Sequence, residues 1–406
     1  MANPVRLGVV GGRRGSSFDA ALKAFPEKIQ LAALCDLDEA LLAAARERTP
    51  GLKTTVSYDK LLEDPNIDAV LIATPMQLHA PQAIQALKAG KHVLSEVIAA
   101  VTLDECWELV ETVEKTKRTY MLSENYCYTR QAMMIKNMCD QHAFGEITTV
   151  EGAYLHDCRH LMYYPDNTRT WRGTITCTAQ IGRSNSYPTH SVGPIAQWLN
   201  ITRGDEFVRT TTFVSREAAR SDYVAAKLGK DHPEAQPSAW AGASDGASTL
   251  IETKNGRVVV LRFDCATPRP HDMARHAVHG SRGAFITGRH WKEDPLVWIE
   301  GVSHGSALAG SNQEPEWQAL WELADRYEHP RWKKHREAAE KAGHGGGDFF
   351  VLEDFADAIG KKRLPAIDVY DAVTWSCIAP LSAENVRKNG QTLDFPDFLR
   401  GKKRGE

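Results

Sequence analysis

The sequence predicts an α/β protein in which a doubly wound parallel sheet is followed by an α+β domain with a mainly antiparallel open sheet. Two observations lead to this prediction. Up to residue 125, short apolar runs alternate with segments of helical period, as in repeated βα units. Beyond residue 141, several runs alternate like strands, and Asn255-Gly256 joins two of them as a strong hairpin signal. We expect one domain over residues 1–126 and a second over 127–406, whose C-terminal helices can pack back on the first.

Residues 5–36 have the order strand, glycine turn, helix, strand. Apolar runs cover residues 5–10 and 29–34, and a segment of helical period covers residues 17–25. Glycines in such a turn let the backbone approach a pyrophosphate, whose charge is met by the N–H groups and dipole at the helix start. The glycines here are Gly11, Gly12 and Gly15.

An acidic residue closes this segment. Asp36 stands 21 residues after Gly15, where a carboxylate can bind the adenosine ribose of a dinucleotide and repel the additional phosphate of NADP. A strict G-x-G-x-x-G would need glycine in place of Val10, so an ordinary tight turn is the alternative. Strand, helix and acidic residue in register favour a Rossmann-type domain that binds NAD rather than NADP.

The rest of the first domain continues the alternation. We expect helices over residues 37–48, 81–89 and 103–116, and strands over 69–73, 93–94 and 119–122. Ligands of such a sheet lie beyond the carboxyl ends of its strands. The candidate cofactor-binding residues are therefore Gly11, Gly12, Arg13, Arg14, Gly15, Asp36, Thr74, His79 and Glu96.

In the second domain, we expect a helix over residues 129–141, followed by strands. The strands fall at residues 147–154 and 208–214, in a hairpin over 248–265, and in a pair over 276–286. Residues 218–247 are predicted to be a long loop, residues 314–341 helical, and two further helices follow the HGGGD segment at 344–348. An open sheet leaves one apolar face to cover, so we expect a homo-oligomer, a dimer or larger.

The composition of the chain limits the classes of partner and the cellular location that we expect. A formal net charge of −3 gives no electrostatic reason to expect nucleic acid, and no apolar run approaches the ~20 residues of a membrane span. The eight cysteines are scattered without a C-x-x-C pair, which is typical of reduced thiols, and the chain enters its first strand without a signal-peptide pattern. We therefore expect a cytoplasmic protein with a small-molecule substrate.

We expect no metal site. Two pairs of histidines lack the companion ligands of a zinc site: His156 with His160, and His276 with His279.

The segment TPMQLHAPQAIQALKAGKHVLSE, residues 74–96, resembles the Gfo/Idh/MocA family of nicotinamide-dependent sugar oxidoreductases. In that family the segment precedes a Glu-Lys-Pro tripeptide, which reads Glu96-Val97-Ile98 here. The lysine is implied to help move the proton of the oxidised hydroxyl in the dehydrogenases. Valine cannot do so, which argues against a simple dehydrogenase.

Further segments resemble one branch of the family, the NAD-dependent α-N-acetylgalactosaminidases of glycoside hydrolase family 109. They are residues 96–116, SENYCY at 123–128, FGEITTVEGAYLHDCRH at 144–160, NSYPTHSVGPIAQWLNITRGD at 185–205, HGGGD, and DVYDAVTWS at 368–376. The resemblance implies a glycosidase that oxidises the sugar at C3, eliminates across C1–C2, adds water and reduces C3 again. The substrates would be N-acetylgalactosaminides or related glycosides. No pair of carboxylates for direct hydrolysis can be selected from the sequence.

The resemblance implies that Glu124, Tyr154, Tyr187 and His190 carry the proton transfers. Tyr154 would be the base at C2, acidified by a nearby positive charge. His190 would be a neutral base for the 3-hydroxyl in the first turn of a helix that Thr189 can cap. From the residues alone, each has a structural alternative: Glu124 as a helix cap, Tyr154 as a packed sheet residue, and His190 as a structural histidine.

Two readings of function remain beside the glycosidase. One is a plain NAD-dependent sugar dehydrogenase, and the other is a non-catalytic NAD- or sugar-binding protein.

Two further groups of residues have open alternatives. Aromatic residues near the site could stack on a sugar or pack in the core. The glycines around His344 and Asp348 imply close approach to a ligand or a neighbouring helix. The aromatic residues are Tyr163, Tyr164 and Trp171.

Overall fold

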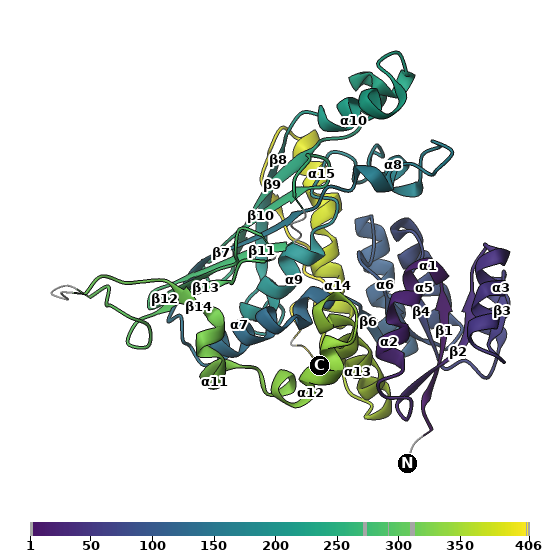
Figure 1. The fold of residues 1–406 in the computed structure, drawn as a ribbon, viewed down its shortest axis with the longest axis horizontal. Helices are drawn as coiled ribbons and strands as arrows, with labels where there is room; N and C mark the ends of the chain where they lie inside the picture. Colours follow the sequence, from purple (N-terminus) through teal and green to yellow (C-terminus); the bar gives the residue numbers. More distant parts are fainter. Residues whose placement is uncertain (1–2, 271–273, 291, 309–312, 403, 405–406) are drawn as a thin grey trace. The chain divides into compact units, whose positions relative to one another are not determined.

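The computed structural model describes residues 3–270, 274–290, 292–308, 313–402 and 404 (Figure 1). The chain forms two compact units. The first contains Met1–Arg130 and Pro330–Cys377, and the second contains Gln131–His329 and Ile378–Glu406. The helices after residue 330 are thus divided between the two units.

The first unit is built on a parallel sheet with the strand order β3-β2-β1-β4-β5-β6, six strands among the described residues. Every neighbouring pair of these strands runs parallel. The doubly wound sheet predicted from the sequence is confirmed. The strands are β1 Val5–Val10, β2 Ile29–Cys35, β3 Lys53–Thr55, β4 Ala69–Ile72, β5 His92–Ser95 and β6 Tyr120–Leu122.

Helix boundaries follow capping signals where these exist. Thr102 and Glu105 form a capping box, and α6, Leu103–Thr116, has the predicted ends. The prediction of a helix over residues 17–25 is wrong at both ends, because helical backbone begins directly after the left-handed Gly11 and α2 ends at Leu22. The other helical segments here are α1 Gly12–Gly15, η1 Ser16–Phe18, α2 Asp19–Leu22, α3 Glu39–Arg48, α4 Tyr58–Glu63, η2 Met76–Leu78, α5 His79–Lys88 and η3 Asn125–Tyr128.

Three late helices complete the first unit: α12 Pro330–Glu340, α13 Gly347–Gly360 and α14 Val369–Ser376. The HGGGD segment lies between α12 and α13 and includes η8, His344–Gly346. A Cβ on Gly346 would lie 2.5 Å from the Trp332 ring, and one on Gly347 would lie 2.4 Å from the Asn125 carbonyl oxygen. These glycines therefore serve close packing between neighbouring segments of the protein.

The second unit contains a sheet of nine strands within the described residues, in the order β14-β13-β12-β11-β7-β10-β9-β8-β15. Its pairings are antiparallel except that of β7 with β10, which confirms the mainly antiparallel sheet. The strands are β7 Ile147–Leu155, β8 Phe207–Val214, β9 Gly246–Thr253, β10 Val258–Asp264, β11 Ala274–Gly280, β12 Gly283–Ile286, β13 Leu296–Ile299, β14 Gln318–Ala319 and β15 Leu393–Asp394.

Helix α9, Thr189–Trp198, packs against β7, β10 and β11 on one face of this sheet (Figure 1). The contact is close at Gly152 of β7, where a Cβ would lie 2.6 Å from the Ser191 carbonyl oxygen and 2.8 Å from Ile195 Cδ1. On β11, the buried His276 places Nε2 3.1 Å from the same Ser191 oxygen. The start of α9 is thereby held against the central strand. The remaining longer helices of the unit are α7 Arg130–Asp140 and α15 Ile378–Arg387.

Some predictions for the later part of the chain are wrong. Residues 218–247 are not a plain loop, because they contain α10, Ala219–Leu228, which the buried Arg220 ties to Asp245 at 3.0 Å. Residues 314–341 are only partly helical, and three helices rather than two follow HGGGD. The shorter segments here are η4 Arg159–Leu161, α8 Trp171–Ile175, η5 Pro233–Ala235, η6 Pro237–Trp240, η7 Leu320–Leu323 and α11 Ala324–Tyr327.

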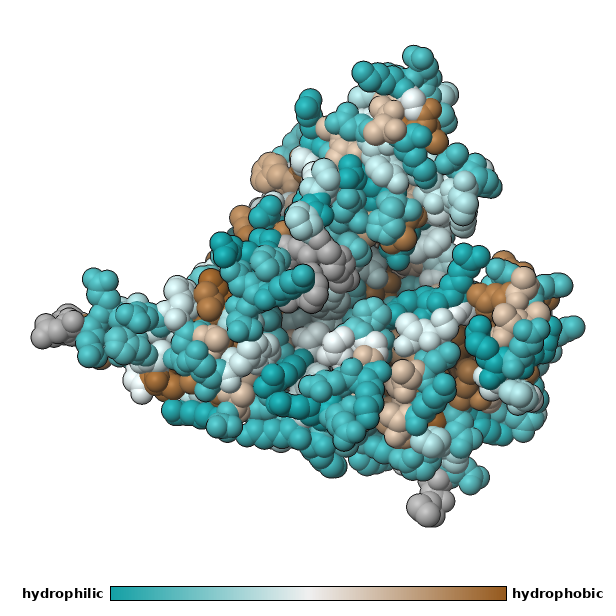
Figure 2. Space-filling model, in the orientation of Figure 1, coloured by the Kyte–Doolittle hydropathy of each residue, from teal (hydrophilic) through white to brown (hydrophobic). Residues whose placement is uncertain are grey.

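The surface in Figure 2 is hydrophilic over most of the visible face, with apolar residues in small separate patches. Among the described residues, no helix combines the length and apolar character that crossing a membrane requires.

Gly152→Ala should lower stability by about 1–3 kcal/mol, because the methyl group must push α9 away from β7 in a packed interior. Denaturant unfolding measures the change. Gly360→Ala is the matched control, since a Cβ there meets no atom within 4 Å. Equal stability of the two variants would contradict the close packing of α9.

Candidate active site

The glycine turn and Asp36 are joined by hydrogen bonds in the first unit. The Gly12 N–H donates to Asp36 Oδ2 at 2.7 Å, and the Asp38 N–H donates to Asp36 Oδ1 at 2.9 Å. Gly11 has φ +91°, and a Cβ there would lie 2.5 Å from the Ala73 carbonyl oxygen. Because side chains are excluded from this turn and a carboxylate stands at the end of β2, the residues fit a dinucleotide.

Arg14 follows the glycine turn and lies between two acidic residues. Its Nη2 is 2.7 Å from Glu96 Oε1 at the end of β5, and 3.9 Å from Oδ1 of the fully buried Asp348. Asp348 also lies 2.8 Å from His344 Nδ1 and accepts from Asn125 Nδ2 at 2.9 Å. The HGGGD segment thus supports Arg14 and the segment after β6. Arg13 is largely exposed and pairs with Asp38 at 3.2 Å.

Thr74 and His79 lie beyond the end of β4. The His79 ring is buried and bridges two backbone oxygens, with Nδ1 2.8 Å from the Ile98 carbonyl and Nε2 2.8 Å from the Thr74 carbonyl. Thr74 Oγ1 donates to Gln82 Oε1 at 2.6 Å. The predicted cofactor residues at the ends of β1, β2, β4 and β5 therefore all belong to one unit. The Val97–Ile98 peptide after Glu96 is cis.

Glu124 belongs to the same unit and is fully buried after β6. Its Oε1 accepts from the Tyr126 N–H at 3.1 Å, so it caps η3. This is the structural role that the sequence offered as an alternative to proton transfer. A buried carboxylate at the end of a sheet strand can serve both roles.

Tyr154, Tyr187 and His190 come together in the second unit. The ring centroids lie 5.5 Å apart for Tyr154 and Tyr187, 5.1 Å for Tyr154 and His190, and 5.1 Å for Tyr187 and His190. Tyr154 is at the end of β7, and His190 is the second residue of α9. Two phenols and an imidazole thus form one cluster of proton-handling groups.

The cluster continues beyond the residues that the sequence singled out for catalysis. The Tyr154 hydroxyl lies 2.9 Å from His156 Nδ1. The buried Cys158 and Cys265 belong to the same apolar core cluster as Tyr154. The signal that could have indicated His156 and Cys158 is their position two and four residues after Tyr154, since alternate residues of an extended chain point to one side.

The structure corrects the prediction for Thr189 and bears on the alternatives for the three aromatic residues. Thr189 does not cap α9, because the N-cap is Pro188 and Thr189 is the first helical residue, with its Oγ1 fully buried. Tyr163 is a core residue that donates to Glu234 and packs beside Trp240. Tyr164 is 44% exposed, whereas Trp171 is only partly exposed and has the Arg172 guanidinium over its ring at 4.6 Å.

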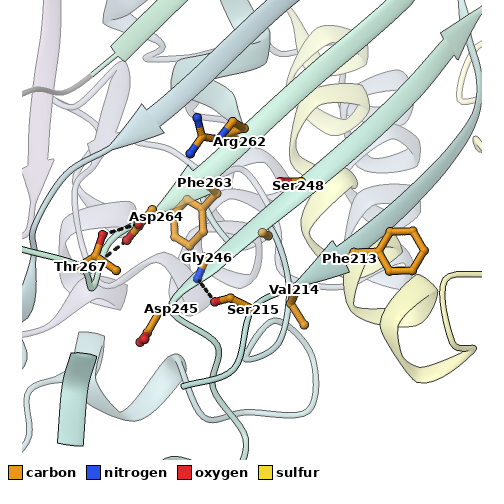
Figure 3. Close-up of a pocket in the computed structure, with 11 residues that line it drawn as sticks. Phe213, Val214, Ser215, Asp245, Gly246, Ser248, Arg262, Phe263, Asp264 and Thr267 are labelled. Carbon is orange, nitrogen blue, oxygen red and sulfur yellow. Dashed lines mark hydrogen bonds between the residues drawn. The ribbon is translucent and has the colours of Figure 1, made fainter. Parts of the chain in front are cut away.

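An open pocket of about 420 Å³ lies at the ends of β8, β9 and β10 in the second unit. Figure 3 shows Phe263 within it, Asp264 bonded to Thr267, and Phe213 pointing away. Phe263 and Ala247 line this pocket and also pack in the core cluster of Tyr154. Within the described residues, no group of three or more His, Cys, Asp or Glu side chains could hold a metal ion.

Comparisons with known proteins agree with this arrangement. Residues 5–124 match the model of the GFO_IDH_MocA oxidoreductase family with an NAD-binding Rossmann fold, and residues 128–404 match the glycosyl hydrolase 109 C-terminal domain. A glycosyl hydrolase family 109 protein of Stenotrophomonas maltophilia (strain K279a) is 34% identical, covering 98% of this chain and 89% of that protein. A family 109 protein of Shewanella sp. (strain ANA-3) is 35% identical, covering 98% and 85%.

Among solved structures, a levoglucosan dehydrogenase in complex with NADH and levoglucosan has a TM-score of 0.74 at 21% identity, covering 97% of this chain and all of that one. A putative myo-inositol dehydrogenase from Sinorhizobium meliloti 1021 has a TM-score of 0.67 at 19% identity, over 97% of this chain. At such identities these likenesses concern the fold. The family resemblance is confirmed by the sequence matches: the protein belongs to the glycosyl hydrolase 109 family and carries an NAD-binding Rossmann domain.

Proposed function

We propose that this NAD-dependent enzyme is a glycoside hydrolase acting on N-acetylgalactosaminides or related glycosides. The observation that carries the proposal is the cluster of Tyr154, Tyr187 and His190, whose rings lie 5.1–5.5 Å apart in the part of the chain that matches family 109. A cluster of neutral bases and phenols suits a route made of proton transfers at the sugar. Direct hydrolysis would instead need a pair of carboxylates.

The cofactor would be held by the first unit, with the glycine turn against the pyrophosphate and Asp36 at the ribose. Bound NAD supplies a hydride acceptor and donor, which the reaction uses at C3 of the sugar. Arg14 adds positive charge beside the turn, while Glu96 and Asp348 fix its position. Bound NAD at this turn therefore meets residues that are already held by hydrogen bonds.

The second unit would handle the substrate protons. His190 accepts the proton of the 3-hydroxyl, and Tyr154 removes the hydrogen at C2, which the ketone at C3 acidifies. Loss of the C1 substituent and addition of water complete the cleavage. Tyr187, in contact with both rings, orients them, and Glu124 is the candidate proton carrier of the first unit.

The rival function is an NAD-dependent sugar dehydrogenase. Val97 stands where the related dehydrogenases would carry lysine, and it is buried, so no cation is available at that position. This favours the hydrolase.

The eight cysteines all lie in the described part of the chain, and none of them forms a disulfide there, which supports a reducing compartment and hence the cytoplasm as the proposed location.

A panel of chromogenic glycosides, assayed without added cofactor, tests the proposed function. A hydrolase that regenerates its own NAD releases the chromophore over many turnovers without accumulating NADH. Production of one NADH for each sugar, with the glycosidic bond intact, would establish the dehydrogenase instead.

Asp36→Ala should weaken NAD binding about tenfold or more and reduce the preference for NAD over NADP, because the carboxylate is lost from the ribose position. Fluorescence titration with each nucleotide measures both effects. Asp104→Ala, an exposed acidic residue in the first turn of α6, is the control and should bind as the natural protein does. Unchanged selectivity in Asp36→Ala would place the ribose elsewhere.

His190→Ala and Tyr154→Phe should each lower kcat by about 10²-fold or more while leaving NAD bound, since both act on substrate protons. The two variants should stop the reaction at different steps. The loss of His190 should abolish transient NADH absorbance, whereas Tyr154→Phe should retain that absorbance and stop cleavage. Near-normal turnover in both variants would show that the two residues are structural and not catalytic.

We further propose that a second copy of the chain covers the outer face of the nine-stranded sheet. Apolar residues gather there opposite the helices: Phe213, Leu250, Val258, Val260, Ile286, Leu296 and Trp298. Leu250 is 48% exposed near the middle of β9. An isologous dimer would bury this face.

Leu250→Glu should convert the dimer to a monomer, because a carboxylate cannot be buried there unpaired. Light scattering over a range of protein concentrations measures the mass. A natural protein that remains monomeric at all concentrations would refute the dimer.

A further inference from the structure

The chain continues along the sheet after Tyr154, beyond the end of β7. The His156 N–H donates to the Asp264 carbonyl at 2.9 Å, and the Cys158 N–H donates to the Cys265 carbonyl at 3.0 Å. These two bonds carry the contact of β7 with β10 past the last paired residues, with the register slipping by one residue at Cys158. Alternate residues of an extended chain point to one side, as Tyr154 and His156 do, and Cys158, where the backbone leaves the extended conformation, completes a row of three residues.

Contacts along the row join its polar atoms. The Tyr154 oxygen lies 2.9 Å from His156 Nδ1, and the two rings meet edge to face. His156 in turn shares a hydrogen bond with the Cys158 sulfur, which also interacts with the Cys265 thiol. Tyr154, Cys158 and Cys265 are 7–9% exposed, and His156 between them is half-buried.

The charges of the row favour an ion pair. The hydrogen bond from the Cys265 thiol, helped by His156 and opposed by burial, lowers the pKa of Cys158. The hydrogen bond with Cys158 raises the pKa of His156 against its burial. Burial raises the pKa of Cys265, so that thiol stays protonated and donates. The two shifts act together and favour a Cys158 thiolate beside a His156 imidazolium.

Other charged groups act on His156 from the elements around it. Arg172 of α8 opposes its protonation, while Asp157, in its own segment and paired with Arg159 at 2.8 Å, favours it. Tyr187 and His190 contact Tyr154 from the segment that begins α9. The hydrogen bond with Cys158 is the main cause that raises the pKa of His156.

We propose that His156 is a positioning residue for the reaction: its imidazolium, paired with the Cys158 sulfur, donates its Nδ1–H to the Tyr154 oxygen and stabilises the phenolate that removes the sugar C2 proton. This role rests on the proposed function of Tyr154. In the step itself the phenolate takes the C2 proton and becomes a phenol, and the C2–H electron pair passes into the enolate of the C3 ketone. His156 keeps both of its protons throughout. The protein thereby supplies a positive charge next to the base from its own chain.

The sign of the pH dependence follows from this arrangement. Tyr154 is an active base only above the pH at which it ionises. A neighbouring cation favours the phenolate and therefore lowers that pH. Removing the cation should move the ionisation of Tyr154, and with it the acid limb of the rate profile, to higher pH.

The test compares His156→Gln, Cys158→Ser and the control His160→Gln, whose histidine is exposed in η4. Tyrosinate absorbance is titrated in each holoenzyme without substrate, and the same titration of a matching protein that also carries Tyr154→Phe is subtracted. The difference is the ionisation curve of Tyr154 alone. The pH profile of kcat/KM for glycoside cleavage is measured on the same proteins.

In His156→Gln the Tyr154 midpoint should rise by about one to two pH units, as expected when an opposite charge is removed. Cys158→Ser should raise it in the same direction by less, because the imidazolium loses its anion but the ring remains. His160→Gln should leave it unchanged. An unaltered Tyr154 midpoint in both His156→Gln and Cys158→Ser would overturn the proposal.

The two readouts separate failure of this inference from failure of the proposed function. The absorbance titration requires no turnover, so it decides the role of His156 even if no glycoside is cleaved. A shifted midpoint together with an unshifted kcat/KM profile would also overturn the proposal, because Tyr154 would then not be the base whose ionisation limits cleavage.

Discussion

The second unit depends on the position of β7 at the centre of its sheet. β7 pairs with β11 on one side and with β10 on the other, and only the β10 pairing is parallel. Gly152 allows α9 to approach β7 so closely that a single methyl group would collide with the Ser191 backbone. Because Tyr154 follows Gly152 by two residues and His190 precedes Ser191 directly, this packing fixes the distance between the two rings. The geometry of the site is thus set by backbone packing beneath it.

In the first unit, too, the backbone fixes the site, because hydrogen bonds with backbone groups hold the candidate cofactor residues in place. Asp36 receives N–H groups from Gly12 and Asp38, and His79 joins the backbone after β4 to that after β5. A preorganised cradle loses little entropy when a nucleotide binds. The buried Asp348, supplied from the far end of the sequence, holds Asn125 and His344 together and lies near Arg14.

Local signals predicted the parts of the fold that depend on neighbours in sequence. The glycines before α2, Asp36 at the end of β2 and the Thr102 capping box could all be read directly, and α6 has both predicted ends. Residues 218–247 were predicted to be a loop from their composition. Helix α10 was missed there, because it depends on the buried Arg220–Asp245 pair, a long-range contact that composition does not reveal. Tyr154, Tyr187 and His190 were identified by family resemblance. His156 and Cys158 were missed as partners of Tyr154, because the role that we propose for them depends on Cys265, which is distant in sequence.

We propose that the glycosidic bond breaks by elimination across C1 and C2 after oxidation at C3. The most direct test is cleavage of a glycoside in heavy water, followed by mass and NMR analysis of the released sugar. Elimination removes the C2 hydrogen and replaces it from solvent, so we predict deuterium at C2 with no net NADH. Cleavage that leaves C2 fully protiated would contradict elimination, because the bond would then have been broken by direct displacement at C1.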